Sequence, residues 1–271
     1  SFGQTFVSYP TRRVVQVMSA QGTFVAKIDD QPLVHDAPVA RAAVFDFLAR
    51  HGFAHSPALV NTRTDQRLIE TAGQTIVLME YLGGELPRST PATWAQLGTI
   101  ARTLNAFSTY PYPYGIDTSA AIAELRVQAE THRQRAQFHQ WISFIAPVAQ
   151  VTQRGLIHGE INLANTARRS NGTLVLLDWD EAGHGPAILE AAYPLIVVFL
   201  SEQLEFQREC AAAFYHSYYA GRAPGSDERD MLFRGAVLHA LRYMQFANQQ
   251  QRWERIGYAI AQQEQLLSVL P

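Results

Sequence analysis

The sequence contains little cysteine and lysine and has no long apolar run. Cys210 is the single cysteine among 271 residues, so a disulfide within the chain is impossible and a reducing cytoplasm is the expected compartment. A membrane span needs about 18 apolar residues. The longest apolar candidate, residues 187–200, is interrupted by Glu190 and Pro194 and is predicted to be a buried helix. The N-terminus has no charged-then-apolar leader, so secretion is not expected.

Strong charge of either sign is also missing. The formal net charge is −2 and adjacent arginines occur only in pairs, so the sequence predicts no basic surface for nucleic acid or for a membrane. The hydrophobic content of 47% and the charged content of 17% are typical of a packed globular protein. A glycine-rich phosphate loop is not recognisable, because Gly3 is the only glycine among residues 1–13.

The first part of the chain is rich in strand signals. Runs of Val, Phe and Thr predict strands at residues 13–18 and 23–28 around a glycine turn. A helix is predicted at residues 39–48, with Asp36 as its cap and Gly52 at its end. Further strands are expected at residues 58–62, 66–71 and 74–81.

The remainder of the chain is predicted to be mainly helical, because apolar residues recur there at helical spacing. This change of pattern predicts an α+β fold with a β-rich lobe of residues 1–84 and a helical lobe of residues 85–271. The expected helices cover residues 94–107, 120–149, 196–206, 227–248 and 250–270.

The most informative segment is HGEINLANTARRSNGTLVLLDWD, residues 158–180. Asn171-Gly172 lies between two β-prone stretches and is a strong hairpin signal. Such a hairpin brings Asn165 near Asp178, and both offer the oxygen ligands that magnesium prefers. An acid, an amide and two further acids around a hairpin are what metal-assisted phosphoryl transfer needs.

A second signal comes from the basic residues. Of 22 basic residues, Lys27 is the only lysine and the others are arginine. Compositional bias with one chance lysine on an exposed strand would explain this pattern. A compact ammonium on an alternating strand is, however, what reaches nucleotide phosphates in kinases. We favour the functional interpretation.

These residues resemble the aminoglycoside phosphotransferase and choline kinase-like family, relatives of protein kinases with small-molecule substrates. The family's loop reads HGD, with an asparagine five residues after the aspartate and an IDW or IDF segment further on. Here Glu160 stands at the aspartate position, while Asn165 and the LDW segment around Asp178 match. The resemblance implies a two-lobed protein-kinase-like fold, Glu160 and Asn165 as catalytic residues, and magnesium bound by Asn165 and Asp178. It also implies that Lys27 holds ATP phosphates and that His158 supports the loop.

The segment VLMEYLGGELP resembles the family's hinge, where backbone groups meet the adenine ring, and this places Glu80 and Tyr81 at the nucleotide. A strand edge entering a turn would give the same letters. In the family a helix glutamate pairs with the strand lysine, but Arg41 aligns with it here. Asp46 lies about 140° around the helix from that position, so Asp36 is the better candidate partner.

Two functions are therefore considered. The first is an ATP- and Mg²⁺-dependent kinase that moves the γ-phosphoryl group to a hydroxyl of a small molecule, such as an aminoglycoside or a choline-like metabolite. The second is a kinase-like module that binds a nucleotide or a partner without catalysis. Glu160, Arg41 and the missing glycine loop favour the module. The retained Lys27, Asn165 and Asp178 favour the enzyme, which is our prediction.

Overall fold

The computed structural model describes residues 2–9, 12–30, 37–71, 73–83, 86–113, 117–244 and 249–271. By internal contacts the chain divides into two compact units. The first unit comprises Ser1–Pro87 and Ala164–Asp180, and the second comprises Arg88–Leu163 and Glu181–Pro271. The predicted lobe boundary, between residues 84 and 85, lies outside the described residues and stays a prediction.

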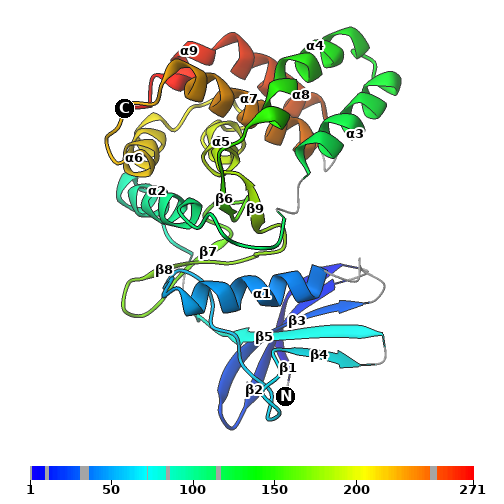
Figure 1. Ribbon diagram of the computed structural model, residues 1–271, viewed down its shortest axis with the longest axis vertical. Coiled ribbons are helices and arrows are strands. Elements are labelled where there is room, and N and C mark those ends of the chain that lie inside the picture. Colours follow the sequence, from blue (N-terminus) through cyan, green and yellow to red (C-terminus); the bar gives the residue numbers. More distant parts are fainter. Residues whose placement is uncertain are drawn as a thin grey trace. The chain divides into compact units, whose positions relative to one another are not determined.

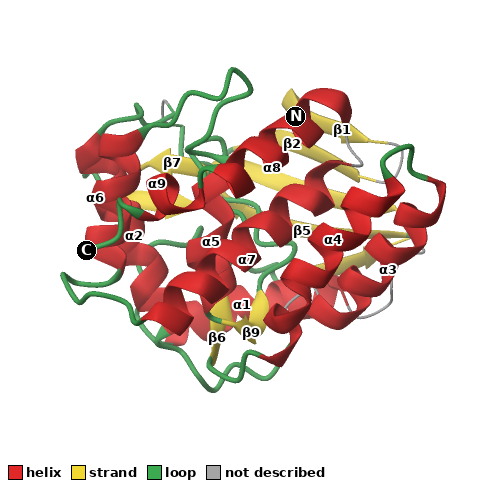
Figure 2. Cartoon of the chain, turned by 90° about the horizontal axis from the view of Figure 1, so that it is seen from above, coloured by secondary structure: helices red, strands yellow, loops and turns green. Residues whose placement is uncertain are grey.

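Strands predominate in the first unit and helices in the second (Figure 1). Figure 2 shows the helices in red and the strands in yellow. The predicted α+β class is therefore confirmed. Within the described residues, no helix is both long and apolar enough to cross a membrane.

The first unit is built on a five-stranded antiparallel sheet with the order β1-β2-β3-β5-β4. Its β2–β3 turn contains Gly22 at a φ of +137°, which glycine adopts without steric cost. The predicted strands at residues 13–18, 23–28 and 74–81 are confirmed. The strand bounds are β1 (Phe2–Tyr9), β2 (Arg12–Ser19), β3 (Gly22–Asp30), β4 (Leu68–Thr71) and β5 (Gln74–Glu80).

The side chains of strand β3 alternate between two faces of the sheet, one apolar and one that carries Lys27. Ala26 and Ile28 pack with Val15 of β2 in an apolar cluster. Because successive side chains of a strand point to opposite faces, Val25 and Lys27 lie on the other face. Lys27 is only 6% exposed.

A helix, α1 (Ala37–Arg50), accompanies the sheet. Phe45 and Leu48 of this helix are buried. It ends at Arg50 and is followed by Gly52, whose φ of +69° is typical of the left-handed residue just beyond a helix. The predicted helix at residues 39–48 is therefore confirmed, whereas its predicted cap, Asp36, lies outside the described residues.

The predicted hairpin is also present, as β7 (Thr166–Arg168) paired with β8 (Leu174–Leu176). In its turn Gly172 has a φ of +88°. The side-chain oxygen of Asn171 accepts a hydrogen bond from the amide of Thr173 at 3.0 Å. The Asn-Gly pair thus determines the turn for the reason that the sequence suggested.

The second unit consists mainly of helices around an apolar core. Helices α2 and α6 pack so closely that a Cβ on Gly98 would lie 2.2 Å from the carbonyl oxygen of Phe214. Strands β6 (Arg154–Ile157) and β9 (Gly183–Pro186) form a two-stranded antiparallel ribbon. In sequence, β6 precedes and β9 follows residues 158–182. The helices are α2 (Pro91–Asn105), α3 (Thr118–Thr131), α4 (Arg135–Ile145), η1 (Ala146–Gln150), α5 (Ile188–Val197), α6 (Arg208–Tyr218), α7 (Ser226–Tyr243), α8 (Gln249–Ala261) and α9 (Gln263–Leu267).

Two predicted elements were wrong. Residues 196–206 are not a helix, because α5 ends at Val197 and the chain then turns, with Leu204 at a φ of +65°. The hydroxyl of Ser201 accepts hydrogen bonds from two backbone amides of this turn and so competes with a helix. Residues 58–62 form only an isolated bridge between Leu59 and Met79 instead of a strand.

Candidate active site

Asp178 lies directly after the hairpin and is held in an unusual backbone conformation. Its φ is +57°, a left-handed value that non-glycine residues adopt at an energetic cost and mostly where the surroundings enforce it. The surroundings are supplied by Trp179, which is buried against Phe45 and Phe53. The Asp178 side chain remains 46% exposed. Burial of the tryptophan therefore presents the neighbouring carboxylate outward.

The hairpin brings Asn165 and Asp178 to the same place. The amide of Leu177 donates a hydrogen bond to the carbonyl oxygen of Asn165 at 2.8 Å. Asn165 and Asp178 also line one cavity of the first unit. The structure thus brings the two predicted metal ligands together on the hairpin.

Lys27 is paired with acids that follow the hairpin. Its ammonium donates to Oδ1 of Asp178 at 2.9 Å and also contacts Asp180. A buried ammonium is costly unless it is paired. The candidate partner Asp46 is wrong, because its carboxylate pairs with Arg67. The other candidate, Asp36, and the side chain of Arg41 lie outside the described residues.

Arg12 is a site residue that the sequence did not indicate. Its Nε donates to Oδ1 of Asp29 at 2.6 Å, and its Nη1 contacts Asp180. Burial lowers the pKa of Arg12, but the carboxylates of Asp180 and Asp29 outweigh burial and leave that pKa raised. We call the following five residues the ionic network: Arg12, Lys27, Asp29, Asp178 and Asp180.

A cavity of about 450 Å³ lies beside the ionic network. Three of its apolar lining residues, Val14, Val25 and Met79, come from β2, β3 and β5. Its polar lining includes Arg12, Lys27, Asn165 and Asp178. One cavity within the first unit therefore combines an apolar wall with cations and oxygen ligands.

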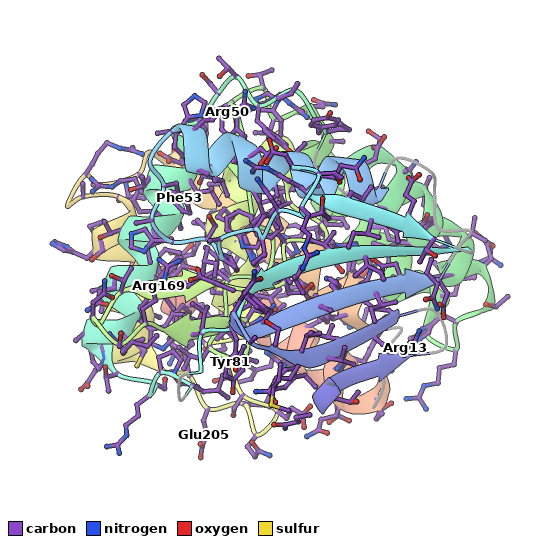
Figure 3. All side chains as sticks on the ribbon, turned by 90° about the horizontal axis from the view of Figure 1, so that it is seen from below. Arg13, Arg50, Phe53, Tyr81, Arg169 and Glu205 are labelled. Atoms are coloured by element: carbon purple, nitrogen blue, oxygen red, sulfur yellow. The ribbon has the colours of Figure 1, made fainter. Side chains whose placement is uncertain are left out.

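Glu80 and Tyr81 lie at the end of β5 beside this cavity. The Glu80 carboxylate accepts a hydrogen bond from the amide of Ala58 at 2.9 Å and pairs with Arg169. Tyr81 is partly exposed and its ring stacks on Phe6 with centroids 6.3 Å apart. Figure 3 labels Tyr81 and Arg169. The side chain of Glu80 is thus held at the end of the strand by contacts within the first unit.

Glu160 belongs to the second unit, where it accepts a hydrogen bond from the hydroxyl of Tyr243. The ring of His158 accepts a hydrogen bond from the Glu160 amide at 3.3 Å. His158 itself is fully buried. Its contact is that of a residue supporting the loop backbone, as expected from the sequence.

Glu190 of α5 is buried and binds the backbone of the loop that begins at His158. Its carboxyl group accepts hydrogen bonds from the backbone amides of His158 and Gly159. Complete burial raises the pKa of Glu190 to about 8, although the two amide hydrogen bonds act in the opposite direction. The sequence signal that could have identified this residue is a single acid within an apolar helix.

Three comparisons relate the chain to known proteins. The phosphotransferase enzyme family matches residues 11–231. No curated protein sequence matches the chain. Amicoumacin kinase, solved with AMP-PNP and Ca²⁺, has a TM-score of 0.70 at 12% identity, covering 98% of this chain and 89% of that chain.

Two further solved structures are similar over comparable lengths. Spectinomycin phosphotransferase, solved with ADP and spectinomycin, has a TM-score of 0.64 at 15% identity, with 99% and 91% of the two chains covered. An aminoglycoside phosphotransferase from Alicyclobacillus acidocaldarius has a TM-score of 0.62 at 14% identity, with 99% and 93% covered. These likenesses establish the kinase-like fold, with its β-rich N-terminal and helical C-terminal parts. By its family match, the chain belongs to the phosphotransferase enzyme family.

Proposed function

We propose that this phosphotransferase moves the γ-phosphoryl group of ATP to a hydroxyl group of a small molecule and that it requires Mg²⁺. The observation that carries the proposal is the buried Lys27, the only lysine of the chain, ion-paired with Asp178 beside Asn165. An ion pair made by a buried lysine contributes little net stability, so its position at a cavity favours a functional role.

The cavity of the first unit suits a nucleotide. Its apolar wall from β2, β3 and β5 would take the adenine ring, and the backbone at Glu80 and Tyr81 would supply hydrogen bonds to the ring edge. Lys27 would hold the α and β phosphates as a compact cation. The structures solved with ADP and with AMP-PNP support the choice of an adenine nucleotide. We therefore assign nucleotide binding to residues 1–84 together with the hairpin.

The ionic network fits a divalent cation. Two of its carboxylates, those of Asp178 and Asp180, meet at the ammonium of Lys27. Asp178 and Asn165 would hold the metal through the hard oxygen ligands that Mg²⁺ prefers. When bound, Mg²⁺ neutralises negative charge on the phosphate oxygens. The carboxylate of Asp178 is exposed enough to serve both this ligand role and Lys27.

Glu160 would accept the proton of the attacking hydroxyl, which is the role of the family's aspartate. Its side chain is one methylene longer, and Tyr243 holds one of its carboxylate oxygens. A fixed glutamate can thereby act where the aspartate is expected. Asn165 follows Glu160 by five residues, the spacing of the family's loop. We assign acceptor binding to the helical part, residues 85–271, and place the reaction in the cytoplasm, where ATP is supplied and the lone Cys210 stays reduced.

The experiment that tests this function pairs a catalytic screen with a binding assay. ATP consumption is measured with a library of hydroxyl compounds, and nucleotide binding is measured by thermal shift with and without Mg²⁺. We expect turnover with at least one compound and a Mg²⁺-dependent shift with ATP. Nucleotide binding with no turnover on any compound would favour the non-catalytic module.

The matched variant is Asp178→Ala, compared with Asp227→Asn on α7. Asp178→Ala removes a metal ligand and the partner of Lys27, so we expect loss of the Mg²⁺-dependent shift and a fall in turnover of at least about a hundredfold. The Asp227 variant should behave as the parent. An unchanged Mg²⁺ dependence in Asp178→Ala would refute the metal assignment.

A further inference from the structure

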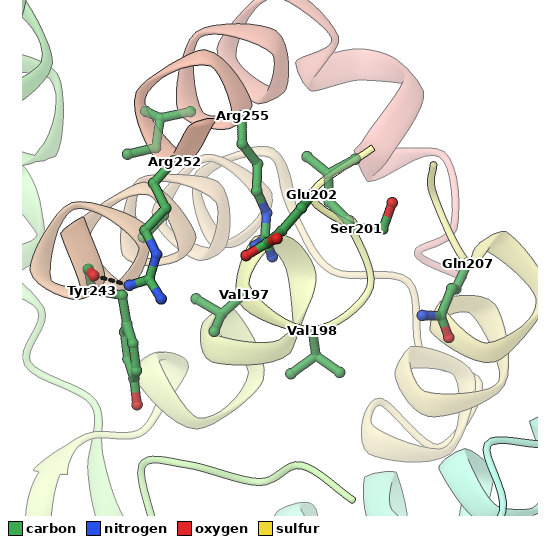
Figure 4. A pocket seen from close by; sticks show the side chains of 11 residues that line it. Val197, Val198, Ser201, Glu202, Gln207, Tyr243, Arg252 and Arg255 are labelled. Atoms are coloured by element: carbon green, nitrogen blue, oxygen red, sulfur yellow. Dashed lines mark hydrogen bonds between the residues drawn. The ribbon is translucent and has the colours of Figure 1, made fainter. Parts of the chain in front are cut away.

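A second cavity, of about 430 Å³, lies within the helical unit. It is bounded by the end of α5, by the turn that follows it, and by α7 and α8 (Figure 4). Val197, Val198 and Ile256 supply apolar walls, and Ser201 and Gln207 supply polar groups. The cavity is therefore large enough for a small metabolite and is lined by both kinds of group.

Two arginines of α8 enter this cavity. Arg252 and Arg255 are three residues apart, so they lie on the same face of the helix. Each is anchored by a main-chain carbonyl: Arg252 donates to the oxygen of Tyr243, and Arg255 donates to the oxygen of Ile196. The anchors fix both guanidinium groups in position without neutralising them.

Within the described part of this cavity, the two arginines outnumber the single acid, Glu202. Among the described side chains, neither Arg252 nor Arg255 has a carboxylate within ion-pair distance. The Nε atom of Arg255 is buried and has no hydrogen-bond partner within the described part of the chain. Glu202 lines the same cavity but is exposed, and it leaves one net positive charge among the three groups. A buried donor without a partner is costly, so an incoming acceptor atom would relieve that cost.

The electrostatic effect of this arrangement appears on Arg255. Burial, and next the charge of Arg252, lower the pKa of Arg255 to about 10, while Glu202 acts in the opposite direction. At neutral pH the group is still a cation. The same repulsion between the arginines would be reduced by a bound anion.

Tyr243 connects this cavity to the proposed catalytic carboxylate. Its backbone oxygen accepts from Arg252, and its hydroxyl donates to Glu160. The arginine and the carboxylate are thus contacted by opposite ends of one tyrosine. Tyr243 therefore joins the lining of the cavity to Glu160.

We propose that the cavity lined by Arg252, Arg255 and Tyr243 binds a carboxylate or a phosphate group of the acceptor and so presents the acceptor's hydroxyl to Glu160. The proposal rests on the proposed function, because it names the substrate class of that site. It selects hydroxylated acids or phosphate esters and disfavours polycationic acceptors, since like charges in a cavity repel.

The test uses the full chain and four probes that share one sugar scaffold: D-gluconate, D-glucose 6-phosphate, D-glucose and D-glucosamine. Binding of each is measured by calorimetry in the absence of nucleotide. We expect the two anions to bind at millimolar concentration or below, and the neutral and cationic sugars to bind at least tenfold more weakly. The tighter of the two anions shows whether the cavity is suited to a carboxylate or to a phosphate.

The variants are Arg252→Met and Arg255→Met, with exposed Arg126→Met on α3 as the matched control. Loss of one charged hydrogen-bond donor should weaken anion binding by about tenfold or more, and Arg126→Met should leave it unchanged. Arg255→Lys retains the charge and should recover part of the affinity, which keeps the test decisive if Arg255→Met fails to fold. Tighter binding of glucosamine than of either anion, or unchanged anion affinity in Arg252→Met and Arg255→Lys, would overturn the proposal.

The same measurements separate this proposal from the proposed function. Arginine-dependent anion binding without phosphoryl transfer from Mg²⁺-ATP to any acceptor would support the cavity and contradict the kinase. Rapid phosphorylation of a cationic acceptor, with no arginine-dependent anion binding, would support the kinase and contradict the cavity.

Discussion

The two units treat buried charge in different ways. In the first unit, the ionic network joins cations to carboxylates, and acids outnumber bases within it. In the second unit, three charged side chains meet backbone groups instead: Glu190 accepts from amides, while Arg252 and Arg255 donate to carbonyl oxygens. Backbone partners orient a charge without cancelling it. The first arrangement therefore suits a bound cation, and the second suits a bound anion.

The same contrast predicts different stability losses when a charged side chain is removed from each unit. Removing one member of a buried ion pair leaves the other unpaired and typically costs several kcal/mol. A charge held by a carbonyl oxygen leaves no unpaired opposite charge when it is removed. Variants in the two units should therefore differ in their effects even when the residue removed is a buried cation in each case.

The largest expected effect comes from Lys27→Met compared with Arg255→Met. Lys27→Met leaves Asp178 and Asp180 close together without their shared cation, so we expect a loss of about 3 kcal/mol in the free energy of unfolding. Arg255→Met removes a cation that has no acidic partner and should cost about 1 kcal/mol or less. Urea unfolding of both variants measures the difference. Equal losses would mean that pairing with carboxylates and pairing with backbone carbonyls contribute equally to the free energy of unfolding.

The second prediction concerns Glu160, whose carboxylate accepts a hydrogen bond from the hydroxyl of Tyr243. Glu160→Gln removes the proton acceptor, so turnover should fall by about a hundredfold. Glu160→Asp keeps the acid but withdraws it from the Tyr243 hydroxyl, and we expect about a tenfold loss. Steady-state kinetics with the acceptor found in the screen measures both.

The control for Glu160 is nucleotide affinity, which should be unchanged because the proposed nucleotide ligands lie in the first unit. Tyr243→Phe should reproduce the loss seen with Glu160→Asp and add little to it in the double variant, since both act on one contact. A Gln variant as fast as the parent would exclude Glu160 as the proton acceptor.

Much of the fold and several candidate site residues could be predicted from the sequence because their signals are local. Asn171-Gly172 gives the hairpin, and alternation gives β3 with Lys27 on one face. The same local reasoning failed at residues 196–206, where apolar spacing continued beyond the actual end of α5. There the hydroxyl of Ser201 stabilises a turn that hydrophobic periodicity does not reveal.

The residues that sequence reasoning missed act through long-range contacts. Asp180 reaches Lys27 across 153 positions of the chain, and Arg12 reaches Asp180 across 168. No local pattern encodes which acid approaches a buried lysine. The helix candidate Asp46 pairs with Arg67 instead, and Asp36 lies outside the described residues and stays a prediction. Glu190 supports a loop about 30 residues earlier, and only its isolation among apolar residues distinguishes it in the sequence.

The last prediction, measured over a narrow range of pH, tests the backbone-held acid, Glu190. Burial raises its pKa to about 8 from the ordinary 4.5, so the folded protein binds this proton more tightly than the unfolded chain does. Its contribution to stability is complete below pH 4.5 and is lost as the pH rises through about 8. Between these values, stability should fall by at most about 1.4 kcal/mol per pH unit. The best window is pH 7.5 to 8, because His239, whose pKa burial lowers to about 3 from 6.5, is then largely neutral in both states.

Glu190→Gln keeps the size and an oxygen that can accept from the amides of His158 and Gly159, but it cannot titrate. Urea unfolding at several pH values should therefore give a flatter profile for this variant than for the parent, while exposed Glu209→Gln should follow the parent. If the two profiles are parallel, Glu190 is ionised throughout, and a carboxylate in the second unit is then stabilised as fully as those of the ionic network. In that case Glu190 would no longer distinguish the two units. The contrast in how they hold buried charge would then rest on Arg252 and Arg255 of α8 alone.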